Sequence, residues 1–109
     1  MAFDKCTECT YNKHVNVIWD PARARTNRRK HGVDFADAAL ALALEDENAL
    51  TIATVEDGEF RFKTLARSPE TNVLLVVHAE ESEDTIVIIS ARVADAHLKR
   101  QYFQGDYHE

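Results

Sequence analysis

The chain has 109 residues, a length typical of one domain that can bury a core of its own. Its 45% hydrophobic and 29% charged residues are ordinary for a globular protein, and the net charge of −6 argues against a uniformly basic nucleic-acid-binding surface. No apolar run approaches the ~18 residues of a membrane span, and residues 1–14 lack the apolar core of a secretory signal. We therefore expect a cytoplasmic protein that does not enter a membrane.

The positive charge is concentrated on one short segment. Five of the eight residues in 23–30 are Arg or Lys and none is acidic, whereas acidic residues cluster at 45–47, 56–59 and 80–84. A local positive site inside a negative field can attract an anionic ligand. The acidic clusters are typical of solvated turns.

The domain is predicted to begin with a strand and a helix. Residues 15–19 are mostly β-branched or aromatic, which favours a strand. Asp20 is a good N-cap and Pro21 suits a first helical turn, so a helix should begin there and run to about His31. Gly32 can adopt the left-handed conformation that closes this helix.

A second helix, four strands and a last helix are predicted to follow. Asp34 is an N-cap candidate ahead of apolar residues at helical spacing, and Asp57-Gly58 is typical of a hairpin turn. The strands are expected at residues 50–55, 60–65, 73–77 and 85–89. The last helix is expected at about 94–103, with Ala94, Leu98 and Tyr102 at spacings of four. The order β-α-α-β-β-β-β-α predicts an α+β domain with helices on a mainly antiparallel sheet. We place this domain at residues 15–104, between a polar tail at 1–14 and a short tail at 105–109.

Both cysteines lie in the predicted N-terminal tail, as Cys6 and Cys9. Their spacing fits half of a zinc site or a redox pair, but zinc needs four ligands and His14 is at most a third. No predicted strand precedes the pair as in thioredoxin-like proteins. An unstructured or loosely docked tail is the simpler interpretation.

Candidate site residues lie on the basic helix and on two strands. Asn27, Lys30 and His31 share one helix face, where they can bind a phosphate or a carboxylate, although these three residues alone favour a solvent-facing helix. Arg92 leaves an apolar strand, where an arginine usually pairs with a carboxylate or reaches a ligand. Arg61 and Lys63 share one face of another strand, which fits an RNA backbone or the solvated side of a sheet.

Other signals of chemistry are missing from the sequence. It contains no phosphate-binding loop, no zinc-protease helix motif and no EF-hand, so we expect no metal and no other cofactor. His78, His97 and Tyr107 stand alone in the sequence and are expected to be structural or at the surface.

Three segments together resemble a known family. "WDPARARTNRRKHGVDF", "GEFRF" and "IISARVADAHLKRQY", within about residues 17–102, are similar to the BrnT family of type II toxins. The resemblance implies a RelE-like ribonuclease fold and metal-independent RNA cleavage that inhibits translation. It also implies a BrnA-like ribbon-helix-helix antitoxin, an oligomeric complex with it, and contact with operator DNA only through that antitoxin.

The resemblance assigns roles to the candidate residues. RNA cleavage without a metal needs an acid, a base and cations that stabilise the developing phosphoryl charge. The implied catalytic residues are Lys30, His31, Arg61 and Arg92, with His31 as acid or base. The implied RNA-binding residues are Asn27, Arg28, Lys63 and Tyr102, of which Asn27 orients the helix or contacts RNA and Tyr102 packs or stacks beside the site.

Two other hypotheses stay open at this point. Ala66, Val93 and Leu98 stand where the family usually has a glycine, a lysine and a glutamate, so the protein can instead be a catalytically weakened or inactive member. Its basic helix would then grip an acidic antitoxin segment, and its task would be assembly and autoregulation. A small zinc-linked structural protein, built through Cys6 and Cys9, is the third.

Overall fold

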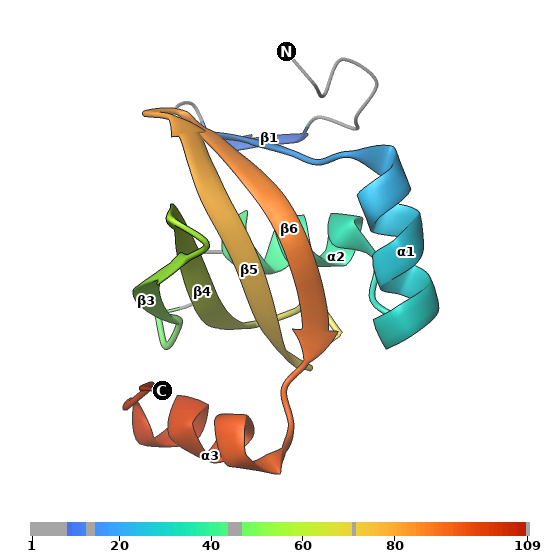
Figure 1. The fold of residues 1–109 in the computed structure, drawn as a ribbon. Helices are drawn as coiled ribbons and strands as arrows, with labels where there is room; N and C mark the ends of the chain where they lie inside the picture. Colours follow the sequence, from blue (N-terminus) through green and yellow to red (C-terminus); the bar gives the residue numbers. More distant parts are fainter. Residues whose placement is uncertain (1–8, 13–14, 44–46, 71, 109) are drawn as a thin grey trace.

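Within the described residues, six strands form one sheet, and three helices pack around it (Figure 1). The computed structural model describes residues 9–12, 15–43, 47–70 and 72–108. In chain order the elements are β1 (Cys9–Asn12), β2 (Val15–Ile18), α1 (Pro21–His31), α2 (Phe35–Ala43), β3 (Leu50–Glu56), β4 (Glu59–Arg67), β5 (Val73–Ser82), β6 (Thr85–Val93) and α3 (Ala96–Gln104). The predicted α+β class and the predicted order of elements are confirmed.

The sheet has the strand order β1-β2-β6-β5-β4-β3. All neighbouring strands are antiparallel except β2 and β6, which run parallel and pair from Asn16↔Thr85 to Ile18↔Val87. β5 and β6 lie in the middle, as their apolar sequences predict, because both faces of a central strand are covered. β1 is an additional edge strand inside the segment expected to be a polar tail, and it pairs with β2 through its main chain, which requires no apolar pattern.

One face of the sheet is covered by α2, which lies behind the sheet in Figure 1. The core on this side joins α2 to the sheet, and the rings of Trp19 and Phe35 meet edge to face with centroids 6.1 Å apart. Ala38 and Ala39 are fully buried, which allows the helix to approach the sheet closely. This core holds α2 against the central strands.

The other face is covered at one end by α3, which lies beneath the sheet in Figure 1. Leu98 and Tyr102, predicted at helical spacing, pack there against Leu65 and Leu75. Tyr107, which lies in the predicted C-terminal tail, joins the same core and is buried there. The rest of this face, toward the β3–β4 hairpin, carries no helix in Figure 1 and is called the open face below.

The local signals for α1 and for the hairpin are borne out. Asp20 Oδ1 accepts a hydrogen bond from the Ala22 amide at 3.0 Å, and Gly32 closes α1 with φ of 72°. Asp57 and Gly58 both have positive φ, as a tight hairpin turn between β3 and β4 requires. Within the described part of the chain, no helix is long and apolar enough to cross a membrane.

Candidate functional site

A buried asparagine holds α1 against the sheet, beside a partly buried Ala24 that packs on the core. α1, described over its whole length, buries one residue, Asn27, which is 5% exposed. Its side-chain amide donates to the carbonyls of Ala91 at 2.8 Å and Val33 at 3.1 Å, and its oxygen accepts from the Ala91 amide at 3.0 Å. The Asn27 side chain thus donates a hydrogen bond to the main chain of Ala91 and accepts one from it, as a neighbouring strand would do. Asn27 therefore satisfies main-chain hydrogen-bonding groups of β6 beyond Val87, where the pairing of β6 with β2 ends.

The attachment of α1 leaves a polar helix face beside β6, where Figure 1 shows the two elements side by side. This face and β6 line an open pocket of about 210 Å³, which we call the α1 pocket. It is lined by Arg23, Thr26, Asn27, Lys30, His31, Ile89 and Ser90. Three of these side chains are basic and none is acidic, so the pocket suits an anion.

A second pocket of about 280 Å³ adjoins the first on the open face, and we call it the β4 pocket. It is lined by Arg23, Glu59, Arg61, Ala79, Glu80, Glu81, Val87 and Ile89. Arg23 and Ile89 line both pockets, so the two are adjacent. Arg61 Nη2 contacts Glu59 Oε1 at 2.9 Å, so this arginine already holds one carboxylate.

The remaining cations of the open face follow from the strand register. Lys63 pairs with Val77 and Val77 with Ser90, so all three lie in one row across the sheet. Lys63 Nζ lies 3.3 Å from Glu56 Oε2. Arg92 is two residues beyond Ser90 and therefore lies in the next row on the same face, but it lines neither pocket.

Arg92 is also close to the start of α3. The amide of Leu98 donates to Asp95 Oδ1 at 2.9 Å, and this hydrogen bond lowers the pKa of the Asp95 carboxyl. The positive charge of Arg92 lowers the same pKa further. Arg92 is therefore placed between the α1 pocket and the N-terminus of α3, with an acidic neighbour.

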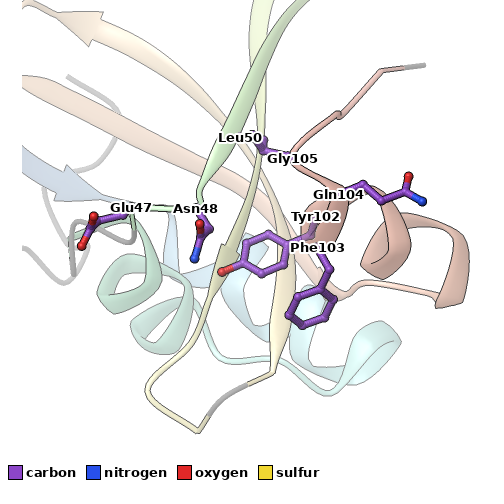
Figure 2. Close-up of a pocket in the computed structure, with 7 residues that line it drawn as sticks. All are labelled: Glu47, Asn48, Leu50, Tyr102, Phe103, Gln104 and Gly105. Atoms are coloured by element: carbon purple, nitrogen blue, oxygen red, sulfur yellow. The ribbon is translucent and has the colours of Figure 1, made fainter.

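Two predicted RNA-binding residues lie elsewhere. Arg28 is absent from the lining of both pockets, and its guanidinium donates to the carboxylate of Asp34. Tyr102 is 2% exposed in the core beneath α3. It borders a different pocket of about 390 Å³, where Figure 2 shows its hydroxyl directed toward Asn48 and its ring beside Phe103. The structure therefore does not bring Tyr102 together with Lys30 and His31.

His78 is structural, as the sequence predicts. It lies on the α2 side of the sheet, with its ring stacked on Phe62 at 5.7 Å and its Nε2 2.9 Å from Thr64 Oγ1. Burial lowers its pKa to about 4, so it is neutral at pH 7. It has no access to either pocket, because these open on the opposite face.

Arg23 is the site residue that we missed. It precedes Asn27 by four residues and Lys30 by seven, so helical spacing alone puts it on their face. Ile89 and Ser90 of β6 carried no comparable signal. Nothing in the sequence showed that α1 lies beside this part of β6.

A metal centre has no support among the described residues, because no three His, Cys, Asp or Glu side chains gather closely enough to hold an ion. Cys6 lies outside the described residues, and the side chain of Cys9 is not among those described. The zinc hypothesis therefore stays a prediction.

The fold and the site together define a small α+β protein that lays a cationic helix along the part of β6 beyond its pairing with β2. Residues 19–97 match the family of the ribonuclease toxin, BrnT, of type II toxin-antitoxin systems. The crystal structure of the Brucella abortus ribonuclease toxin, BrnT, is similar at 27% identity with a TM-score of 0.58, over 72% of this chain and 95% of that one. No curated protein matches. The chain belongs to the BrnT family of type II toxins, and this membership implies an antitoxin partner.

Proposed function

We propose that the chain is a metal-independent endoribonuclease that cleaves RNA in the cytoplasm and thereby inhibits translation. The observation that carries the proposal is the α1 pocket, whose lining includes Arg23, Lys30 and His31 and no acidic side chain. A pocket with several fixed cations attracts a phosphodiester, and a histidine can exchange a proton near neutral pH. Membership of a ribonuclease toxin family supports the same activity.

In the proposed reaction the RNA 2′-oxygen attacks the adjacent phosphorus and the bond to the 5′-oxygen breaks. A base takes the 2′-hydroxyl proton, and an acid returns a proton to the leaving 5′-oxygen. His31 performs one of these transfers, because it is the imidazole that lines the pocket. Lys30 and Arg23 stabilise the charge that develops on the phosphoryl oxygens.

The other predicted residues act around this centre. Arg92 lies beyond the α1 pocket along the open face, where it contacts a neighbouring phosphate. Arg61 lies in the adjoining β4 pocket, paired with Glu59, and contacts the RNA there, and Lys63 lies in the row between Arg61 and Arg92. Both side-chain N–H groups of Asn27 are used by main-chain carbonyls, so its role is to position α1. Arg28 holds the junction with α2 through Asp34, and Tyr102 supports α3 from the core.

The antitoxin is proposed to be a BrnA-like ribbon-helix-helix protein that joins the toxin in an oligomer and carries the contact with operator DNA. An acidic segment of such a protein would compete with RNA for the α1 pocket. A catalytically inactive member that binds its antitoxin in this way is the second candidate. It is favoured by Leu98 and Val93, because Leu98 is buried in the α3 core and neither position supplies the charged group usual in the family.

The test is cleavage of a defined RNA by the purified chain in EDTA. We expect His31→Ala to lower the rate at least ~10²-fold, as loss of an acid or base does, and Lys30→Ala to lower it as well. Arg25→Ala is the matched control, because it removes one charge from the same helix at an exposed position outside both pockets. It should leave the rate within about twofold, which is the spread of a surface substitution.

Two results would contradict the proposal. If Arg25→Ala reduced cleavage as strongly as His31→Ala, the net charge of α1 rather than the pocket would be responsible. If the folded wild-type chain cut neither free RNA nor ribosome-bound RNA, the inactive, antitoxin-binding candidate would replace the ribonuclease.

A further inference from the structure

The β4 pocket differs in chemistry from the α1 pocket that it adjoins. Its floor is aliphatic and is formed by Ala79, Val87 and Ile89. The pairs Phe62↔His78 and Ala79↔Val87 place Arg61, Ala79 and Val87 in one row across three strands on the open face. An apolar floor of this kind, with charged side chains at its rim, suits the apolar face of an aromatic ring.

The charges at the rim argue against a phosphate in this pocket. Two arginines face three carboxylates there, those of Glu59, Glu80 and Glu81. Arg61 is already paired with Glu59, so a second anion would have to displace that carboxylate and meet the other two. A neutral ligand that donates hydrogen bonds to carboxylates fits this rim better.

Resting on the proposed ribonuclease function, we propose that the β4 pocket binds one nucleobase of the RNA and prefers guanine. The base lies on Val87 and Ile89, and the guanidinium plane of Arg61 stacks on it, as arginine does on unpaired bases. Glu81 accepts the hydrogen bonds of the base edge, because it lines this pocket at the irregularity in β5 between Glu80 and Ser82.

The preference for guanine follows from its donors. Guanine presents a ring N–H and an amino group side by side, so one carboxylate can accept both. Adenine and cytosine offer one amino group beside a ring acceptor, and uracil offers one N–H between two carbonyls that repel a carboxylate. A bidentate contact of this kind distinguishes bases by roughly 5- to 100-fold.

The position of the pocket agrees with this assignment. Arg23 and Ile89 line both pockets, so a base in the β4 pocket is adjacent to a phosphate in the α1 pocket. One nucleotide of the RNA would thus place its base in the β4 pocket and its phosphate in the α1 pocket. The base contact would then select where the chain is cut, while the α1 pocket performs the cut.

The deciding experiment is a nuclear magnetic resonance titration of the full chain with GMP, AMP, CMP and UMP, followed at the amides of Val87 and Ile89. We expect GMP to bind at least about fivefold tighter than UMP, and Glu81→Gln to abolish this preference. Glu83→Gln is the control, because Glu83 is an exposed acid of the same hairpin and lines neither pocket. Equal affinity for the four nucleotides, or a preference that survives Glu81→Gln, would overturn the proposal.

Mapping the cut ends of a randomised RNA separates this inference from the proposed function. Guanine enriched beside the cut in wild type and Glu83→Gln, but not in Glu81→Gln, supports both. Selective GMP binding without any cleavage keeps the base pocket and refutes the ribonuclease. Cleavage without base preference, together with equal nucleotide affinities, refutes the base pocket and keeps the ribonuclease.

Discussion

The helices α1 and α3 have similar ends and opposite means of attachment. Each begins with an aspartate N-cap and closes with a left-handed glycine, Gly32 in α1 and Gly105 in α3. α3 buries Leu98 and Tyr102 in an apolar core, whereas α1 buries only Asn27, whose amide is bonded to main-chain groups. Two short helices of nearly the same design are therefore fixed to one sheet by different forces.

This contrast explains how the fold keeps the cationic face of α1 accessible. A helix that is anchored by apolar packing must turn a whole stripe of side chains inward. A helix anchored through one amide needs only one inward position, so Arg23, Lys30 and His31 stay beside β6 and accessible. The predictions below test this contrast between a helix held by packing and a helix held by hydrogen bonds.

The largest effect on stability is expected in α3, which is held against the sheet by apolar packing. Tyr102→Ala should lower the free energy of unfolding by about 3–5 kcal/mol, because a large side chain that is 2% exposed leaves a cavity. Urea unfolding at equilibrium measures this change. Lys99→Ala, at an exposed position on the same helix, is the control and should change stability by less than about 0.5 kcal/mol. A loss below about 1 kcal/mol in Tyr102→Ala would show that α3 is not held by its core.

The next effect concerns a buried polar group whose hydrogen bonds are incomplete. Among the described residues His78 Nδ1 has no partner, and burial lowers the pKa of this histidine from 6.5 to about 4. Between these values the unfolded chain binds a proton that the folded chain does not, so stability should fall by about 3 kcal/mol as the pH drops from 6.5 to 4. Unfolding free energies across this range measure the slope.

His78→Gln should remove most of that slope, whereas His31→Asn, at an exposed position, should keep it. The pKa values of Asp84 and Asp95 are lowered by their hydrogen bonds, so their contributions are lost only at lower pH. If the unfolding free energy of His78→Gln depended on pH as in the wild type, a group other than His78 would be responsible for that dependence.

Removing the amide that anchors α1 should have a somewhat smaller effect on stability. Asn27→Ala leaves the N–H of Ala91 and the carbonyls of Ala91 and Val33 without this partner, which should cost about 2 kcal/mol. RNA cleavage should fall as well, because α1 loses its position beside β6. Arg29→Ala, exposed on the same helix, is the control for both measurements. Unaltered stability in Asn27→Ala would mean that α1 is held by something other than this amide.

The two helix ends should respond alike to the same change. Gly32 has φ of 72° and Gly105 has φ of 73°, and an added Cβ would meet no atom within 4 Å at either position. Only backbone strain is therefore introduced, and Gly32→Ala and Gly105→Ala should each cost about 1 kcal/mol, measured by thermal unfolding. Unequal costs would show that the attachment of the helix, rather than its end, determines the penalty.

The smallest effect on stability should accompany a clear effect on binding. Lys30→Ala should change the unfolding free energy by less than about 0.5 kcal/mol, because its side chain is exposed. It should reduce the dependence of RNA affinity on salt by about 0.7 in the logarithmic slope, as loss of one phosphate contact does. Lys99→Ala on α3 removes the same charge far from the α1 pocket and should leave the slope unchanged. If RNA affinity depended on salt equally in the two variants, the RNA would not bind at the α1 pocket.

Local signals in the sequence predicted much of the fold. Asp20, Pro21 and Gly32 marked the ends of α1, because capping depends only on neighbouring residues. The spacing of Leu98 and Tyr102 predicted the buried face of α3 in the same way. The sharing of one helix face by Lys30 and His31 could be predicted too, and the family resemblance supplied a function for that face.

Tertiary structure decided what those faces meet. The pattern that put Asn27 beside Lys30 and His31 did not show that its amide turns inward to Ala91, since this contact joins positions 64 residues apart. The burial of Tyr107 likewise depends on partners distant in sequence. The strand at residues 9–12 pairs with the neighbouring β2 through its main chain, which leaves no apolar pattern to predict it.

The types of helix and strand, their ends and the cationic face of α1 could therefore be predicted from the sequence alone. These features follow from residue spacing and local hydrogen bonds. The register of β4, β5 and β6 and the docking of α1 decided which residues share a pocket. They joined Arg23 to Ile89, put Arg61 in the adjoining pocket and left Tyr102 in a separate core. Such groupings depend on long-range pairing, which no short stretch of sequence specifies.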